Sequence, residues 1–174
     1  MATRSYTSRR ELESYHFSLL ATLLVPLALI LIQVFLPRIF PRLIILDLPL
    51  IAVIFFAVAR RSPIVGTLTG ALIGLFEDAL TGQPIGINGI AKAVIGYAAS
   101  SIGVQVDVEN VITRILMNFG FSLLQSVLLI FIQRNLLGVH GFRVLWLHEL
   151  LRAALNTLVA IPLFLFLDRA KRRD

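Results

Sequence analysis

The sequence contains no cysteine, which excludes disulfide bonds, thiolate metal sites and a thiol nucleophile. It is also poor in charge: 15% of residues are charged and 57% are hydrophobic, with a mean hydropathy of +0.88. Soluble domains carry about a quarter charged residues. This composition is typical of an integral membrane protein. The net charge of +6 does not indicate nucleic-acid binding, because the basic residues flank apolar runs, where they set topology and meet anionic lipid headgroups.

Motifs for catalysis or metal binding are missing as well. The stretch His148–Leu150 lacks the second histidine of a zinc-binding HExxH motif, and no glycine-rich loop ends in Gly-Lys-Ser/Thr. The acids Glu77 and Asp78 are adjacent, so on a helix they point in different directions and do not form an acid–base couple. We therefore predict a protein that is not an enzyme, with no catalytic residue, no metal and no cofactor.

Long apolar runs dominate the rest of the chain. A membrane-spanning helix needs roughly 17–25 mostly apolar residues, and the runs predict one all-α bundle of about six transmembrane helices. A polar N-terminal tail (1–16) precedes this transmembrane domain (17–168), and a short basic tail (169–174) follows it. The predicted helices are 17–36, 43–60, 64–80, 87–104, 112–134 and 146–168.

The distribution of lysine and arginine predicts the orientation in the membrane. Loops on the cytoplasmic side carry an excess of these residues. With both termini in the cytoplasm, more of the basic residues fall on the inner side than on the outer side. The residues predicted to act as inner-side topology anchors are Arg60, Arg61, Arg169, Lys171, Arg172 and Arg173.

Two rows of small and polar residues are predicted to face each other across the third and fourth helices. Residues four apart lie on one helix face, and small side chains there allow another backbone to approach closely. The two helices are joined by a short connection, which favours antiparallel neighbours. The first row is Gly66, Gly70, Gly74 and Asp78; the second is Asn88, Lys92, Gly96 and Ser100.

Lys92 has two interpretations at this stage. It could pair with Asp78 across the interface, or it could extend to the headgroups while Asp78 remains solvated. Which of Glu77 and Asp78 is packed inside also stays open. In the connecting turn, Gly82 and Gly86 supply turn conformations and Asn88 is predicted to cap the fourth helix. Asp47, beside Pro49, is predicted to cap the second helix.

The segment "LDLPLIAVIFFAVARRSPIVGTLTGALIGLFEDALTGQPIGINGIAKAVIGY", Leu46 to Tyr97, resembles the central block of the rod shape-determining MreD family. The resemblance is carried by the basic turn Arg60–Arg61, by Gly74 and Asp78 in a G-x-x-x-D pattern, and by the turn residues Gly82, Gly86 and Asn88. It covers about 50 of the 174 residues. The length of the chain, its predicted number of helices and its basic C-terminal tail also agree with the resemblance.

This resemblance implies a non-enzymatic subunit of the bacterial cell-elongation complex, multi-pass in the cytoplasmic (inner) membrane, that helps organise peptidoglycan synthesis and maintain cell shape. The implied partners are MreC, the RodA polymerase and a class B penicillin-binding transpeptidase, with MreB filaments contacted indirectly. The family is similar in fold to the substrate-binding subunits of energy-coupling-factor transporters.

The alternative function is therefore a small-molecule transport subunit of that type; an ion-coupled transporter is a weaker option. A ligand site would need several polar residues to converge. The candidates are Asp47, Asp78, Asn88, Lys92, Asn118, Gln125 and Asn156.

Overall fold

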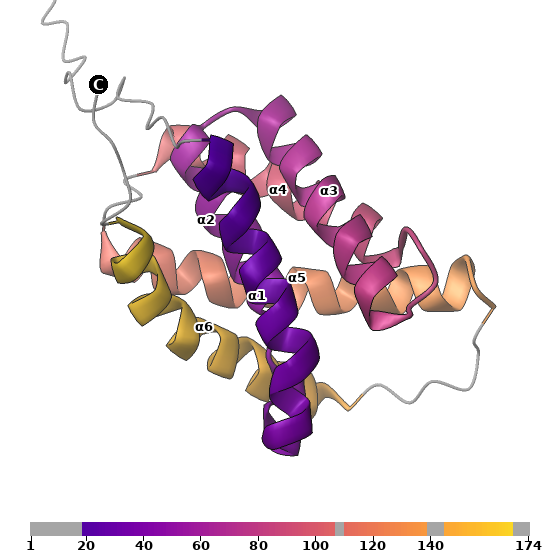
Figure 1. Ribbon diagram of the computed structural model, residues 1–174. Coiled ribbons are helices and arrows are strands. Elements are labelled where there is room, and N and C mark those ends of the chain that lie inside the picture. The colour runs from indigo at the N-terminus through magenta and orange to yellow at the C-terminus, as the bar shows by residue number, and fades with distance from the viewer. Residues whose placement is uncertain (1–18, 107–109, 139–144, 169–174) are drawn as a thin grey trace, which may run out of the picture.

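The computed structural model describes residues 19–106, 110–138 and 145–168, and these form helices with no strand among them. The predicted all-α fold with six helices is confirmed (Figure 1). The predicted tails, 1–16 and 169–174, lie outside the described residues. The elements are α1 (Leu19–Ile39), the 3₁₀ helix η2 (Pro41–Ile45), α2 (Leu48–Arg60), α3 (Pro63–Thr81), α4 (Ile87–Gln105), α5 (Val111–Asn135) and α6 (Trp146–Asp168).

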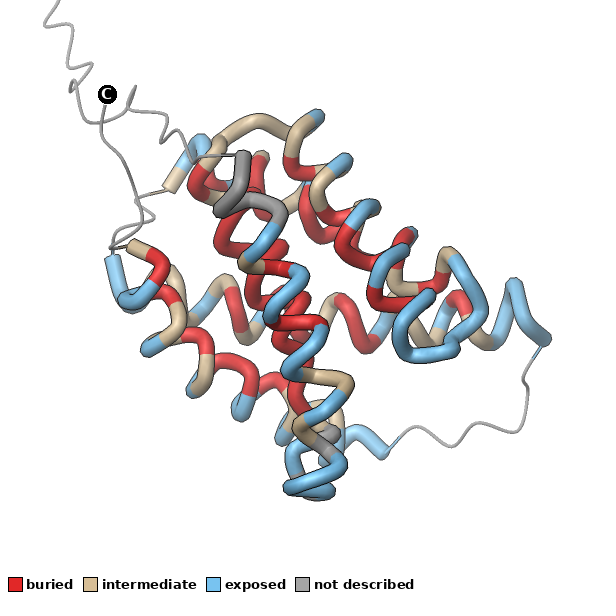
Figure 2. Tube along the Cα trace, in the orientation of Figure 1, coloured by how far each residue is buried: buried red, intermediate tan, exposed pale blue. Residues whose placement is uncertain are grey.

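The helix α2 forms the centre of the bundle. Eleven of its 13 residues are buried, and Figure 2 shows the buried trace running through the middle of the molecule. The core cluster contains most of α2 and adds residues from α1, α3, α4, α5 and α6. A helix that is apolar on every side is stable when lipid or other helices surround it, and α2 is surrounded by helices.

The prediction that the second helix spans 43–60 is wrong at its N-terminal end. Residues 41–45 form η2, and α2 begins only after Asp47. The Asp47 carboxylate accepts a hydrogen bond from the Leu50 amide at 2.9 Å, which confirms the predicted cap. The Asp47 amide donates to the Asn156 side chain at 2.9 Å. Because both groups are used in this way, the helix cannot extend backwards through Asp47.

The helices α3 and α4 lie side by side and run antiparallel (Figure 1). The first begins at Pro63, whose fixed backbone angle suits a first helical turn. It ends at Gly82 in the left-handed region, with φ of 69°. A short turn leads to Gly86, with φ of 106°, and α4 follows.

The described helices fit a membrane environment. Four of them, α3 to α6, are long and apolar enough to cross a membrane. Large apolar side chains are exposed on the outside of the bundle, including Phe35, Leu68, Phe131, Leu158 and Phe166. Acidic, basic and amide side chains are buried inside it. This inside-polar arrangement suits a protein whose outer solvent is lipid.

Candidate functional site

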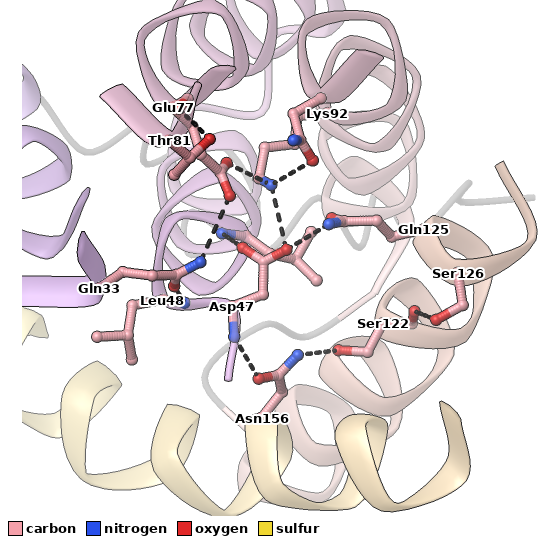
Figure 3. Close-up of polar contacts among 12 residues, drawn as sticks. Gln33, Asp47, Leu48, Glu77, Thr81, Lys92, Ser122, Gln125, Ser126 and Asn156 are labelled. Atoms are coloured by element: carbon pink, nitrogen blue, oxygen red, sulfur yellow. Dashed lines mark hydrogen bonds and ion pairs between the residues drawn. The ribbon is translucent and has the colours of Figure 1, made fainter. Parts of the chain in front are cut away.

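A buried lysine and two acids lie at the meeting point of α2, α3 and α4. The Lys92 ammonium is 2.6 Å from Glu77 Oε2 and 3.2 Å from Asp47 Oδ2. The Lys92 residue is fully buried, and the two acidic residues are at most 4% exposed. Figure 3 shows the lysine nitrogen between the two carboxylates. A charged group this deep in a membrane bundle is stable only when opposite charges and hydrogen-bond partners surround it.

Asp47 gathers further donors from α5 and α6. The Arg152 guanidinium is 3.2 Å from Asp47 Oδ2, and the Gln125 side-chain amide donates to the same oxygen. Arg152 also lies 3.9 Å from Glu149, one turn earlier on α6. The positive end of the α2 dipole adds to the field at Asp47, since the carboxylate sits at the helix N-terminus. Asp47 is therefore the anion around which the other elements converge.

Amide side chains extend the contacts to the remaining helix and fix the backbone. Gln33 on α1 donates to Glu77 at 3.4 Å and accepts from the Leu48 amide at 2.6 Å. Asn156 on α6 accepts from the Asp47 amide and donates to Ser122 of α5 at 3.3 Å. All six helices, with Asp47 as the α2 cap, thus contribute to one polar hub. We define the polar hub as Gln33, Asp47, Glu77, Lys92, Gln125, Arg152 and Asn156.

The predicted pair between Lys92 and Asp78 is wrong, and so is the alternative in which Lys92 extends to the headgroups. Both acids are buried, but they serve different partners. Residues 77 and 78 are about 100° apart around α3. Glu77 therefore points to the bundle centre and binds Lys92, whereas Asp78 points to the turn.

Asp78 holds the turn between α3 and α4. Its carboxylate accepts from the Gly86 amide at 2.8 Å, from the Asn88 amide at 3.2 Å and side chain at 2.8 Å, and from the Gly89 amide at 3.3 Å. Asn88 is thus not the predicted N-cap: Gly86 occupies the cap position and Asn88 lies inside α4. One buried carboxylate thus accepts hydrogen bonds from the amides that begin α4. The positive end of the helix dipole also favours an anion at this position.

The glycine row of α3 packs directly on the α4 backbone. A Cβ atom built on Gly66, Gly70 or Gly74 would collide with the carbonyl oxygen of Gly96, Lys92 or Asn88, respectively. A Cβ on Gly96 would in turn collide with the Gly66 carbonyl. The structure places the two predicted rows in contact. This close approach brings Lys92 near enough to α3 for its side chain to bind Glu77.

The predicted topology anchors are described only in part. Arg60 ends α2, and Arg61 caps it in the left-handed region with φ of 51°. Both are half-exposed at the same end of the bundle as the start of α5. Arg169, Lys171, Arg172 and Arg173 lie outside the described residues.

A comparison with models of protein families matches the sequence of this chain to one of them. The model of the rod shape-determining protein MreD matches residues 14–170, which is nearly the whole chain. The chain belongs to the MreD family. No curated protein matches the chain at a significant level, and no solved structure does so either. The MreD family consists of shape-determining membrane proteins and is not a known enzyme family, and this chain accordingly has a role in rod-shape determination.

The match to the MreD family extends well beyond the block from Leu46 to Tyr97, and so does the hub. That block supplies Asp47, Glu77 and Lys92, but α1, α5 and α6 supply the other members. Sequence reasoning did not assign Glu77 or Arg152 to a shared site. A signal was present on α6: Glu149, Arg152 and Asn156 are spaced i, i+3 and i+7, which puts three polar groups on one face.

A matching signal was present on α5. Its buried polar residues lie at i, i+4, i+7 and i+8 and therefore form one inward stripe. They are Asn118, Ser122, Gln125 and Ser126. Chemically, the hub can neutralise charge and fix helix register, because its carboxylates are engaged by ammonium, guanidinium and amide donors.

Proposed function

We propose that this chain is a multi-pass scaffold subunit of the cell-elongation complex in the bacterial cytoplasmic membrane, where it binds MreC and helps organise peptidoglycan synthesis. RodA and a class B penicillin-binding transpeptidase belong to the same assembly, and MreB filaments connect to it indirectly. The observation that carries this proposal is the polar hub, in a chain whose family determines rod shape.

The hub suits a scaffold because it fixes helix positions. Its hydrogen bonds join groups up to 109 residues apart in sequence. A polar group inside the membrane has few alternative hydrogen-bond partners. Because Asp47 and Lys92 each make several contacts, few other arrangements of the helices would satisfy both residues. The outer faces of α1, α5 and α6 then present apolar side chains at fixed positions. A partner's transmembrane helix recognises such a surface by packing against it.

The alternative of a small-molecule transport subunit has less support. Four of its seven candidate polar residues, Asp47, Lys92, Gln125 and Asn156, bind within the hub. Asp78 and Asn88 hold the α3–α4 turn together. The seventh, Asn118, donates to a backbone carbonyl of its own helix at 3.1 Å. Six of the seven groups are therefore engaged within the hub or the α3–α4 turn, and Asn118 is engaged with its own helix.

The proposed orientation has both termini in the cytoplasm. Arg60, Arg61 and Arg114 occupy the end of the bundle where α1 begins and α6 ends, which supports placing that end inside. The cysteine-free sequence allows a direct test. A single cysteine at Ser62 should be protected from an impermeant maleimide in intact cells, and one at Gln83 should be labelled. The reverse pattern refutes the orientation.

The function itself is tested by affinity purification of the tagged chain from native membranes in mild detergent, followed by mass spectrometry. Recovery of MreC, RodA and the transpeptidase is the expected result. Recovery of ATPase subunits with a coupling membrane protein would replace the scaffold proposal by transport.

A crosslinking scan assigns the contact surface. A photo-crosslinking residue is placed at outward positions such as Leu31, Phe131 and Leu158 on different helices. Capture of MreC from one helix face supports direct binding. If no position on any helix captures MreC in growing cells, the direct contact is refuted. A crosslinker at buried Ala99 is the matched negative control.

A further inference from the structure

Tyr97 is a polar residue on an outward face of α4, and it is 57% exposed. It lies ten residues after Ile87, the first of the 19 residues of α4, so it is roughly 15 Å from the start of the helix. Because the hydrocarbon core is about 30 Å thick, Tyr97 lies close to the bilayer midplane. Tyrosine is instead typical of the membrane interfaces. In the helices that the structure describes, other exposed polar side chains lie near helix ends, such as Arg38, Gln105 and Asn135.

The hydroxyl of Tyr97 needs an acceptor at this depth. Ser100 and Ser101 donate to the Tyr97 carbonyl at 3.0 and 2.8 Å, whereas the phenolic hydroxyl makes no hydrogen bond with the residues that the structure describes. A lipid tail offers no acceptor, and water and the lipid ester groups lie at the membrane boundary, beyond the reach of a tyrosine at the midplane. A polar group left unpaired in hydrocarbon is costly. Another protein can supply the acceptor.

Tyr97 is the centre of an exposed row of residues along α4. Their positions are alternately four and three apart, which is the spacing of a and d positions in packed helices. We define the α4 seam as Ile90, Val94, Tyr97, Ser101 and Val104. All but Ser101 are exposed, and Ser101 is half-buried. The other sides of α4 pack against α2, α3 and α5, so the seam is the face of α4 that these helices leave open.

The length of the seam and the hydroxyl at its centre favour a helix as the occupant. From Ile90 to Val104 the seam measures roughly 21 Å, and a membrane-spanning helix can lie along all of it. The small Ser101 and the β-branched Val94 on either side of Tyr97 allow a close approach. We propose that the α4 seam binds a transmembrane helix of a partner protein, which places an amide or hydroxyl side chain against the Tyr97 hydroxyl. This inference rests on the proposed scaffold function and assigns the surface that recognises a partner.

The test places a photo-crosslinking residue at Val94, one turn from Tyr97, in growing cells. The captured peptide, identified by mass spectrometry, should be a membrane-spanning segment of another protein, with an asparagine, glutamine, serine or threonine within one turn of the crosslinked residue. Tyr97→Phe keeps the ring and removes only the hydroxyl, so capture should fall roughly threefold, the factor for an average hydrogen bond between membrane helices. Unchanged capture in Tyr97→Phe, or capture only of lipid or of a second copy of this chain, overturns the proposal.

The stability of the purified chain separates binding of a partner from a structural role. Because the Tyr97 hydroxyl has no partner among the described residues, Tyr97→Phe should leave the stability of the isolated chain in detergent unchanged or higher. A clear loss of stability would place the hydrogen bond within the chain and overturn the assignment.

A pair of bulky substitutions tests whether the seam itself is occupied. Ser101→Phe fills the middle of the seam and should abolish capture from Val94. Leu116→Phe adds the same ring at an exposed position on α5 and should leave capture intact. Equal losses in the two variants would overturn the α4 seam as the binding surface.

Affinity purification distinguishes failure of this inference from failure of the scaffold function. Recovery of MreC, RodA and the transpeptidase without capture of any helix at Val94 leaves the scaffold function standing and overturns the α4 seam. Capture of a helix that depends on Tyr97, without recovery of those proteins, supports the seam and overturns the scaffold function. If neither is observed, both are overturned.

Discussion

Replacing Lys92 by methionine removes the cation that, among the residues that the structure describes, touches both Glu77 and Asp47. At the observed separations of 2.6 and 3.2 Å, each ionic contact has a gross energy of about 5–6 kcal/mol at an effective dielectric constant of 20. Desolvation of the lysine offsets much of this. Breaking a buried pair by removing one partner typically costs about 3–5 kcal/mol, because the other charge is left buried. We expect a loss of that size.

The same substitution should favour membrane insertion of α4. A lysine at the centre of a spanning helix costs about 2.5–3.5 kcal/mol on insertion scales. Lys92 lies in the second turn of α4, so its cost is smaller, and methionine removes it. Insertion of α4, measured with a glycosylation reporter, should therefore improve while the folded bundle becomes less stable. Stability is measured by unfolding in dodecylmaltoside–SDS mixtures followed by far-ultraviolet circular dichroism. Opposite changes in the two assays identify Lys92 as a residue needed for the fold and not for insertion.

A double variant tests whether the loss comes from uncompensated charge. Glu77→Gln neutralises the acid closest to Lys92, so adding it to Lys92→Met should cost little more than Lys92→Met alone. The two effects should depart from additivity by about 1–3 kcal/mol. Additive losses would refute the ionic explanation and leave packing as the cause. Gln83→Met, at an exposed position in the α3–α4 turn, is the control and should change stability by no more than about 0.5 kcal/mol.

Three further substitutions test the α3–α4 interface, each by the same unfolding assay. Gly70→Ala should destabilise the bundle by about 1–3 kcal/mol through overpacking against the Lys92 carbonyl. The control Gly120→Ala, where the added methyl group meets open space, should be neutral or stabilising by about 0.5–1 kcal/mol. Equal effects of the two substitutions would contradict the close approach of α3 and α4. Asp78→Asn should cost about 1.5–3 kcal/mol, with faster proteolysis of the turn; an unchanged turn would show that the carboxylate is dispensable. Gly86→Ala should cost about 1–2 kcal/mol, because φ is 106° there, and a neutral result would mean that the turn adopts another conformation.

Patterns that repeat at short range were predictable from the sequence. Runs of apolar residues located all six helices, since each run reports that its segment avoids water, either in lipid or inside the bundle. The spacing of the glycines in α3 likewise predicted which face of that helix packs closely, because residues four apart lie on the same face of one helix.

The partners of the buried charges were not predictable in this way. The choice between Glu77 and Asp78 depends on how α3 is rotated relative to α2 and α4, because only Glu77 faces the bundle centre, where Asp47 and Lys92 lie. Three helices therefore decide which acid meets Lys92. A hydropathy profile places Arg152 near the end of a helix and gives no information about its partner. That partner, Asp47, lies 105 positions earlier in the sequence. Contacts of that kind require the relative positions of helices, which no local pattern contains.

The position of Asp47 in the sequence also determines when its contacts can form during synthesis of the chain. Asp47 leaves the ribosome 109 residues before Asn156, its partner on the final helix. At roughly 5–20 residues per second, this interval lasts roughly 5–20 s. During that time the acid at the start of α2 lacks its contacts to α6, and the central helix has no complete enclosure. The contacts of Asp47 to α6 consequently form last, so a chain truncated within α6 leaves the acid at the start of the innermost helix without Asn156.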